Sequence, residues 1–425
     1  MMKLAVIFES SPFDRKGLFN AVHNRVKHLL ATGECTIDVF CVHSRDNAFT
    51  RRVRHTPEVP SVEETVVDGI RYRLLWYRFS ILDNVLLEKL HVRPWLFRRF
   101  MESHVDLLKG YDAVIAHSFC GGLFALAAHE RFGVPYYVKW HGSDVHTHPW
   151  RVPVILEDTR AVMESARCNF FVSRALLEAS EKIISNARKE VLYNGVSEDF
   201  VKYSLEDRAA VRERYGLAPE DKVVAFVGNI VKVKNVLSLP EIFAQVAKGY
   251  DGPLKFWIIG DGKLRKPLEA TMDLSFRPNE VSGEISFFGN QPSPVMPDIM
   301  NCIDVLVLPS LNEGLPLVCA EALSCGAAVV GSDVGGIAEV IGKDNVVPLV
   351  VPNDTDTFPG FPSGPLICTG QEMGNSGRPY DDSFVNGMTE KVVAALTGQS
   401  PFQTLPADIS WARTAALELS ILKSL

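Results

Sequence analysis

The sequence predicts an α/β protein made of two Rossmann-like, doubly wound domains with parallel sheets. The chain has 425 residues, which is more than one hydrophobic core usually serves. Short apolar runs alternate with helix-period segments in two separate series, the pattern of consecutive βαβ units. A charged, turn-rich stretch at 207–222 lies between the two series. We therefore predict domains at 1–206 and 207–400, and a terminal helix within 401–425 that packs back on the first domain.

The first series begins with a βαβ unit. Lys3–Phe8 and Thr36–Val42 are short apolar runs typical of buried parallel strands, and Leu18–Leu30 between them carries apolar residues at helical spacing. Further elements of this series are predicted as strands at 113–117, 135–140, 169–172 and 190–193, and as a helix at 121–132.

The second series starts at Val223 and repeats the alternation. Its strands are predicted at 223–228, 254–260, 284–289, 304–309 and 327–331, with helices between them, one from Pro316 and one from Gly335. In Pro352–Ser383, ten of the 32 residues are Pro or Gly and no apolar period is sustained, so we expect an irregular insertion. Helical patterning returns at 384–396 and at 409–425.

Composition and charge exclude several classes of protein. Hydrophobic residues make up 47% of the chain and charged residues 22%, which is ordinary for a globular protein. A net charge of −7 argues against a nucleic-acid partner. No apolar run reaches the roughly eighteen residues of a spanning helix, and the first ten residues do not resemble a signal peptide. A cytoplasmic chain with reduced cysteines is therefore expected.

A strand, a polar loop and a helix start come together within Leu308–Ile341. Glu313 lies on the loop, and Glu321 lies about one and a half turns inside a helix that starts at Pro316. In a continuous helix their Cα atoms would be about 12 Å apart, too far for two carboxylates that flank one glycosidic bond. The two acids would then hold different parts of one long ligand. The alternative is that both are solvated surface acids.

The helix start between the two acids is suited to phosphate. Its free N–H groups and its dipole favour an anion, and Gly314 allows a ligand to approach the backbone closely. Carboxylates bind sugar hydroxyls through charged hydrogen bonds. A diphosphate flanked by hydroxyl-bearing rings would therefore fit this segment.

This segment closely resembles the E-x7-E region of glycosyltransferase family 4, a family of retaining enzymes with the GT-B fold, including the LPS before it and the SDVGGIAEVI after it. Other landmarks of the family follow in order over residues 1–345: Gly17, HGSD at 141–144, NGV at 194–196, VGNIVKVKN at 227–235 and GDGKLR at 260–265. The resemblance implies two Rossmann-like domains that face a central cleft.

The resemblance also implies roles for the residues at matching positions. Glu313 would contact hydroxyls of the donor sugar, and Glu321 would hold the ribose of the nucleotide. Gly17 would keep its loop open beside the diphosphate. The backbone that lines the donor sugar and phosphates would be that of Gly314, Leu315, Pro316, Leu317 and Val318.

Family members usually carry a G-R-L-x3-K pattern whose Arg and Lys neutralise the leaving diphosphate. Here the pattern reads Gly228, Asn229, Ile230 and then Lys234, so Lys234 matches and Asn229 replaces the Arg. The replacement removes one bidentate phosphate contact. Lys232 is either a substitute for that charge or a solvated surface Lys.

His141 follows a predicted strand at the carboxyl edge, where open α/β sheets bind ligands. The resemblance implies that it faces the donor sugar, and we favour this over a structural role. Asp144 is either an N-cap for the next segment or a polar contact on the acceptor side. The run at 260–262 does not complete a dinucleotide fingerprint, and no Asp-x-Asp pair lies beside the phosphate site. Neither NAD nor a metal is therefore expected.

The region 45–100 combines positive charge with aromatic residues. It holds eleven Lys and Arg against seven Asp and Glu, interleaved with aromatics in RYRLLWYRF at 71–79 and RPWLFRRF at 93–100. This combination suits an anionic lipid surface. The alternative is a strand with alternating faces, followed by a helix whose Trp95, Leu96 and Phe100 belong to the core.

These observations predict a retaining glycosyltransferase that moves a sugar from a nucleotide diphosphate sugar to a hydroxyl of a glycan or lipid-linked acceptor, in the synthesis of cell-surface polysaccharide or glycoconjugates. His141, Lys234 and Glu313 would be its catalytic residues, and its first domain would contact the cytoplasmic face of the membrane. Two other functions stay open: a sugar-nucleotide epimerase or hydrolase of the same fold, and a non-catalytic binding homologue, which only Asn229 suggests.

Overall fold

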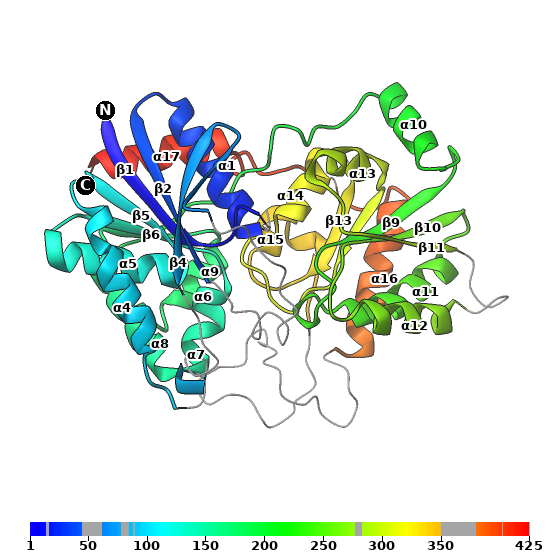
Figure 1. The fold of residues 1–425 in the computed structure, drawn as a ribbon. Coiled ribbons are helices and arrows are strands. Elements are labelled where there is room, and N and C mark those ends of the chain that lie inside the picture. The colour runs from blue at the N-terminus through cyan, green and yellow to red at the C-terminus, as the bar shows by residue number, and fades with distance from the viewer. Residues whose placement is uncertain are drawn as a thin grey trace. The chain divides into compact units, whose positions relative to one another are not determined.

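The structure, a computed structural model, describes residues 1–13, 17–44, 62–77, 85–87, 90–276, 283–349, 380–401 and 403–424. They form two compact units: unit 1 contains Met1–Gly195 and Ser410–Leu425, and unit 2 contains Val196–Ile409. Each unit is built on one sheet that is parallel or nearly so (Figure 1). The prediction of two α/β domains with parallel sheets is confirmed. Every helix among the described residues is too short or too polar to span a lipid bilayer.

Unit 1 contains an eight-stranded sheet in the order β3-β4-β2-β1-β5-β6-β7-β8. Its strands are β1 Met2–Glu9, β2 Cys35–Ser44, β3 Glu64–Val67, β4 Ile70–Tyr77, β5 Ala113–His117, β6 Tyr136–Trp140, β7 Cys168–Phe171 and β8 Lys189–Val191. All neighbours pair in parallel except β3 and β4, which form an antiparallel hairpin at the edge. The strand order reverses between β1 and β5, so the carboxyl ends of these strands and of β6 border the switch point, where such sheets bind ligands.

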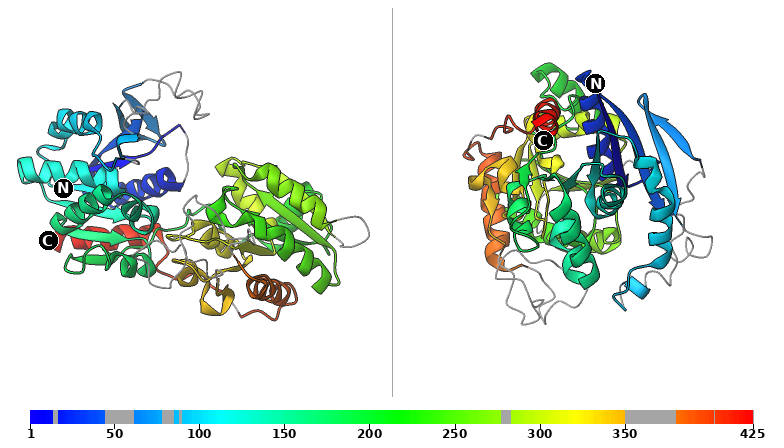
Figure 2. Two further views of the ribbon diagram at one scale, coloured as in Figure 1. Left: turned by 90° about the horizontal axis from the view of Figure 1, so that it is seen from below. Right: turned by 90° about the vertical axis from the view of Figure 1, so that its left-hand side faces the viewer.

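Helices cover this sheet. They are α1 Gly17–Ala31, α4 Trp95–His104, α5 Ser118–Phe132, α6 Ser143–His146, α7 His148–Arg151, α8 Pro153–Ser165, α9 Arg174–Ser180 and α17 Trp411–Ser424, with a 3-10 turn, η1, at Val105–Leu108. The terminal helix α17 lies against α1 (Figure 2). Leu419 and Leu422 of α17 enter the same apolar core as Val22 and Val26 of α1. The last helix of the chain is therefore part of unit 1.

Unit 2 contains a six-stranded parallel sheet in the order β11-β10-β9-β12-β13-β14. Its strands are β9 Lys222–Val227, β10 Leu254–Ile259, β11 Glu284–Gly289, β12 Val305–Leu308, β13 Ala328–Ser332 and β14 Val346–Val347. Its helices are α10 Leu205–Arg214, α11 Leu239–Gly249, α12 Arg265–Ser275, α13 Met296–Cys302, α14 Leu317–Ser324, α15 Ile337–Ile341 and α16 Asp382–Leu396, with 3-10 turns η2 Lys232–Lys234, η3 Val236–Ser238, η4 Ser293–Val295 and η5 Lys343–Asn345. The switch point of this sheet lies between β9 and β12.

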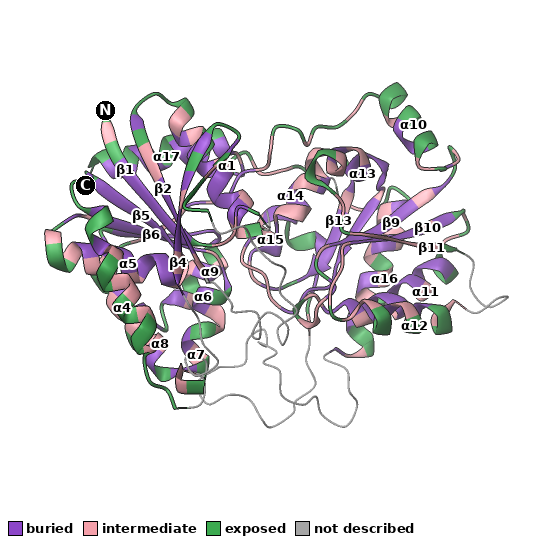
Figure 3. Ribbon diagram, in the orientation of Figure 1, coloured by how far each residue is buried: buried purple, intermediate pink, exposed green. Residues whose placement is uncertain are grey.

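The central strands of both sheets are buried on both faces (Figure 3). Every residue of β5, β6 and β12 is buried, which is why these strands read as mainly apolar runs without a polar face. The edge elements were harder to predict: β14 has two residues, and the hairpin β3–β4 alternates between buried and exposed positions. The strand proposed as one interpretation of 71–79 is present as β4 as far as Tyr77, and residues 78 and 79 lie outside the described residues.

The predicted domain boundaries differ from those of the two units. They were placed after residues 206 and 400, whereas the units meet at 195/196 and 409/410. The reason at the first boundary is that the segment before α10 is held to unit 2: the Tyr203 N–H donates to Asn301 at 2.9 Å and the Tyr203 hydroxyl donates to Asp298 at 2.7 Å. The insertion predicted at Pro352–Ser383 lies outside the described residues except for 380–383.

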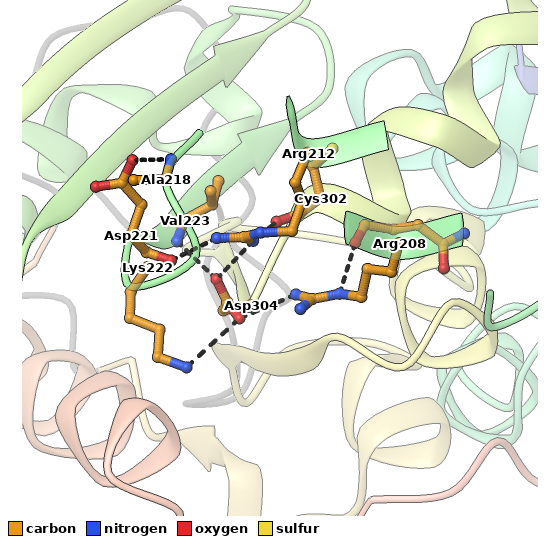
Figure 4. Close-up of polar contacts among 9 residues, drawn as sticks. Arg208, Arg212, Ala218, Asp221, Lys222, Val223, Cys302 and Asp304 are labelled. Atoms are coloured by element: carbon orange, nitrogen blue, oxygen red, sulfur yellow. Dashed lines mark hydrogen bonds and ion pairs between the residues drawn. The ribbon is translucent and has the colours of Figure 1, made fainter. Parts of the chain in front are cut away.

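Asp304, just before β12, joins helix α10 to the sheet of unit 2 through hydrogen bonds (Figure 4). Its carboxylate accepts hydrogen bonds from Arg208 Nη2 at 3.0 Å, from Arg212 Nη1 at 3.3 Å and from the backbone N–H of Val223 at 2.8 Å. Arg212 is itself buried and also donates to the carbonyl of Cys302 at 2.7 Å. Two arginines thus share one carboxylate at the start of the central strands.

Asp304→Asn should therefore destabilise unit 2, because it keeps the shape of the side chain but leaves two arginines without their counter-charge. We expect a loss of about 2 to 3 kcal/mol in the free energy of opening, measured by native-state hydrogen exchange of the β9 and β12 peptides. The matched control is Glu284→Gln, which breaks the exposed pair with Lys255 in the same unit and should cost about 0.5 kcal/mol or less. Equal effects of the two substitutions would contradict this role of Asp304.

Candidate functional site

The loop between β12 and α14 holds Glu313 at the carboxyl end of the central strands of unit 2. The carboxylate oxygen Oε1 of Glu313 accepts hydrogen bonds from Lys234 Nζ at 2.5 Å and from Ser310 Oγ at 2.7 Å. The side chains of Lys234 and Glu313 are 21% and 10% exposed. Two predicted residues, Lys234 and Glu313, are therefore in direct contact although they are 79 positions apart in the sequence.

Backbone contacts hold the two loops together. The N–H of Leu311 donates to the carbonyl of Val233 at 2.8 Å, which joins the loop after β12 to the loop after β9. Gly335, with φ of +52°, lies against the backbone of Glu313, where a Cβ would come within 1.8 Å of the Glu313 carbonyl oxygen. Only glycine fits this contact, which explains the SDVGG run that follows the site in the sequence.

The glycine-rich run at 260–262 packs against the loop after β9. A Cβ on Gly260 would come within 2.0 Å of the Gly228 carbonyl oxygen, and one on Gly262 within 2.3 Å of the Ile230 carbonyl oxygen. These glycines bring two loops of the sheet edge close together.

The other predicted residues of this loop have different surroundings. Gly228 ends β9 with φ of +154°, and the neighbouring Asn229 is exposed. Lys232 lines a groove of about 750 Å³ together with Asn235 and Tyr380. The structure thus brings Lys234 to Glu313, whereas Lys232 has no contact with Glu313 in the described part of the chain.

The predicted helix start is present one residue later than expected. α14 begins at Leu317, Pro316 is its N-cap, and no side chain caps its first turn. The loop residue Gly314 accepts a hydrogen bond from the Gly336 N–H at 3.1 Å. Leu315 is buried, and Val318 lies in the first turn of the helix. The first amides of α14 are thus left for a ligand or for water.

Glu321 lies in α14 among apolar side chains. No described residue donates a hydrogen bond or an opposite charge to its carboxylate, and burial raises its pKa to about 7. A carboxylate in this state is desolvated without compensation, which is characteristic of ligand-binding residues. Glu321 therefore differs from Glu313, whose carboxylate already has two donors.

In unit 1, His141 lies directly after β6, in a turn that Asp144 holds. The carboxylate of Asp144 accepts from the N–H groups of His141, at 3.0 Å, and Gly142, at 2.7 Å, and its own helix α6 is capped by Gly142. Asp144 is 4% exposed, and burial raises the pKa of its carboxyl. The N-cap interpretation of Asp144 was wrong, because Gly142 is the N-cap of α6 and the oxygens of Asp144 hold the turn. Its contact with the acceptor stays a prediction.

Two residues that the sequence did not single out complete this region. His117, the last residue of β5, is fully buried, and its Nδ1 lies 2.9 Å from Nε2 of His141. Ser118 has φ of +59°, which is strained for a residue other than glycine, and its side chain hydrogen-bonds to Asp144. The sequence could have pointed to both residues, since His117 ends the strand predicted at 113–117 and Ser118 follows it, at the same sheet edge as His141.

Gly17 is the first residue of α1 and is exposed, with open space where a Cβ would be. It therefore leaves room beside the carboxyl end of β1. Within the described residues, no group of three or more His, Cys, Asp or Glu side chains is arranged to hold a metal ion.

Comparisons with known proteins match both halves of the chain. A family described as "Glycosyl transferase 4-like domain" matches residues 17–195, and one described as "Glycosyl transferases group 1" matches residues 221–359. A Bacillus subtilis protein named as a teichuronic acid biosynthesis glycosyltransferase is 29% identical over 233 residues, which are 55% of this chain and 56% of that one. The N-acetyl-alpha-D-glucosaminyl L-malate synthase of Bacillus anthracis is 26% identical over 239 residues, 56% of this chain and 59% of that one. The chain thus matches a little over half the length of these curated relatives.

Solved structures resemble the whole chain. The sucrose-phosphate synthase of Thermosynechococcus elongatus has a TM-score of 0.66 at 17% identity, and the match covers 100% of this chain and 95% of that one. The HepE protein of Anabaena, solved in complex with UDP-glucose, has a TM-score of 0.60 at 16% identity, covering 100% and 98%. At these identities the likeness establishes the GT-B fold.

Glu321→Gln should stabilise the protein in a pH-dependent way. The carboxyl titrates at 4.5 when unfolded and at about 7 when folded, so the wild-type protein loses stability as the pH rises through this window. The amide has no such loss, and the variant should gain up to about 2 kcal/mol over wild type by pH 8 and little at pH 4.5. Thermal unfolding across this pH range measures the difference, with the exposed Glu220→Gln as control. A gain that is equal at all pH values would show that the Glu321 carboxylate is solvated.

Proposed function

The chain belongs to the family 4 type of GT-B glycosyltransferases, and we propose that it transfers a sugar from a nucleotide diphosphate sugar to a hydroxyl of a glycan or lipid-linked acceptor, with retention of the anomeric configuration. The observation that carries the proposal is the pair of acids in unit 2: Glu313 is held by Lys234 and Ser310, while none of the residues that the structure describes pairs with Glu321. The first acid is oriented and the second is left for a ligand.

This arrangement of unit 2 would bind the three parts of one nucleotide sugar, the ribose, the diphosphate and the sugar, through different protein groups. The ionised Glu321 would accept hydrogen bonds from the ribose hydroxyls, because two neighbouring O–H donors match the two oxygens of a carboxylate. The uncapped amides of Leu317 and Val318 would bind the diphosphate. The ammonium group of Lys234, which donates to Glu313, would also donate to a phosphate oxygen. Glu313 would bind the sugar hydroxyls.

The reaction would break the bond between the anomeric carbon and the phosphate oxygen, and would form a bond from that carbon to the acceptor oxygen on the same face. The hydroxyl proton of the acceptor would pass to a phosphate oxygen of the leaving diphosphate. The protein would contribute positioning and charge stabilisation through Lys234, Glu313 and His141. No metal is needed in this proposal, since a Lys and helix amides meet the charge of the diphosphate.

Asn229, which stands where the family pattern has an Arg, bears on whether the protein is active. It is exposed at the end of β9, so a ligand can reach it, but it offers no charge to a phosphate. The non-catalytic alternative rests on this residue, whereas Lys234, Glu313 and Glu321 support transfer. The relatives reported above are named as transferases or synthases, which favours transfer over an epimerase or hydrolase.

The outer face of α4 supports peripheral contact with an anionic membrane. Trp95 and Leu96 are 62% and 42% exposed, and the Arg99 guanidinium lies 5.5 Å from the centre of the Trp95 ring. The interpretation that placed Trp95 and Leu96 in the core was wrong, because the helical period turns Phe97 and Phe100 towards the protein instead. Arg93 is bound to Asp158 at 2.7 Å and is not part of this face.

Donor binding should strengthen with pH. Because the free Glu321 carboxyl titrates at about 7 and its ionised form would bind ribose, the Kd should fall by about tenfold between pH 6 and pH 8. Calorimetry with uridine, guanosine and adenosine diphosphate sugars measures this, with and without EDTA. Glu321→Gln should bind more weakly at pH 8 and should lose the pH dependence.

Lys232→Ala is the matched control for Lys234→Ala in the same titration, because of these two lysines Lys234 alone contacts Glu313 in the described part of the chain. Consumption of the donor only when an acceptor is added would support transfer, and consumption without one would support hydrolysis or epimerisation. No binding of any nucleotide sugar would contradict the proposal.

Trp95→Ala combined with Arg99→Ala should reduce binding to vesicles that contain phosphatidylglycerol, because the change removes an interfacial aromatic anchor and a cation from the same face. Co-sedimentation measures the bound fraction, with phosphatidylcholine vesicles for comparison. Leu274→Ala removes an equally exposed apolar residue from unit 2 and should have no effect. If the wild-type protein does not bind the anionic vesicles, the membrane contact is wrong.

A further inference from the structure

A chain of buried polar contacts runs from the terminal helix of unit 1 to His141. Glu418 on α17 and Arg25 on α1 are 0% and 1% exposed and form an ion pair through two hydrogen bonds. Nη1 of Arg25 lies 3.4 Å from Nε2 of His117, and Nδ1 of His117 lies 2.9 Å from Nε2 of His141. Four side chains from four segments of the chain are thus connected in series.

An ion pair in the core need not do more than fasten α17 to α1. Glu418 and Arg25 satisfy each other, and apolar residues of both helices surround them. The additional contact of Arg25 with His117 is not needed for that purpose. It connects the pair to a histidine that is in turn hydrogen-bonded to the candidate site residue His141.

The donors and acceptors in this series are fixed by chemistry. A guanidinium can only donate, so Nε2 of His117 is the acceptor. Burial is the main cause that holds the pKa of both imidazoles well below 6.5, with the buried cations Lys139 and Arg25 adding to it, so both are neutral. A neutral His117 that accepts at Nε2 carries its proton on Nδ1, and it donates this proton to Nε2 of His141. His141 in turn carries its proton on Nδ1.

We propose that Arg25, held by Glu418, sets the tautomers of His117 and His141, so that His141 offers Nδ1–H to a ligand as a hydrogen-bond donor. In the described residues nothing accepts from this atom. The ligand atom it suits is an oxygen, from a sugar hydroxyl or a phosphate. Arg25, Glu418 and His117 are positioning residues, and α17 carries one of them into the site.

The Nδ1–H tautomer of His141 limits what this residue can do in the reaction, and this role rests on the proposed sugar transfer. Nε2 of His141 is occupied by the hydrogen bond from His117, so it is not available as a base. The acceptor proton must then go elsewhere, and a phosphate oxygen of the leaving diphosphate can take it. His141 would stabilise the developing charge and would not remove the proton.

The tautomers can be read directly in the wild-type protein. Two-bond proton–nitrogen correlation spectra of protein labelled with 15N-histidine distinguish Nδ1–H from Nε2–H, and His141→Gln and His117→Gln assign the two signals among the eleven His. We expect Nδ1–H for both residues. Nε2–H at His141, or a charged imidazole at neutral pH, overturns the proposal.

The variant that tests the cause replaces both charges at once. Arg25→Met with Glu418→Met removes both members of the ion pair together, so neither is left buried without its partner, which protects folding. We expect His117 and His141 to lose the uniform Nδ1–H state. In the transfer assay kcat should fall by about 100-fold, as when one aligned donor is lost, while the donor KM should stay within about threefold. An unchanged tautomer in this double variant overturns the role of Arg25.

The control is Thr414→Val, which removes another buried contact of α17, the hydrogen bond of Thr414 to the Tyr193 carbonyl at 2.9 Å, without touching the series. In this variant the tautomers of His117 and His141, and the kcat of the transfer reaction, should equal those of the wild-type protein. The two proposals can fail separately: Nδ1–H at His141 without any sugar transfer leaves the positioning series intact, and transfer with Nε2–H at His141 rejects the series alone.

Discussion

Burial of the central parallel strands on both faces is the constraint on which the rest of the structure depends. Every residue of β5, β6 and β12 is buried, and the strand backbones are paired in the ladders. Within these sheets, the polar side chains with a proposed chemical role then lie where a strand ends. His117 ends β5, His141 follows β6, and Glu313 follows β12, so the candidate residues of each unit gather at one edge of its sheet.

Ionisable side chains that are removed from water need a partner or a shifted pKa. Arg25 and Glu418 are fully buried, and each neutralises the other. Lys139 on β6 is equally buried, and burial lowers its pKa well below 10.5. Glu321 on α14 differs, since it is only part-buried by exposure, yet desolvation raises its pKa to about 7 and no described residue supplies a partner. An uncompensated cost of this kind is retained at sites where a ligand supplies the missing partner.

The loops at the edge of unit 2 are held by contacts that tolerate little change. Lys234 and Ser310 both donate to Glu313, while Gly335 lies directly against the backbone of Glu313. These contacts come from the loops after β9, β12 and β13. The carboxylate is therefore fixed before any ligand arrives, which reduces the entropy that binding must overcome.

The sequence by itself determined the two sheets, the order of their strands along the chain and the segment that holds Glu313 and Glu321, because apolar period, turn residues and helix starts are local signals. Only the tertiary structure decided which groups meet. Lys232 and Lys234 are two residues apart, yet only Lys234 reaches Glu313, and Asp144 holds a turn when its sequence context suggested a cap or an open contact. Glu418 and Arg25 are 393 positions apart, and no local pattern relates them. Such partners are set by how distant elements pack, which depends on the whole core and on no single stretch of the chain.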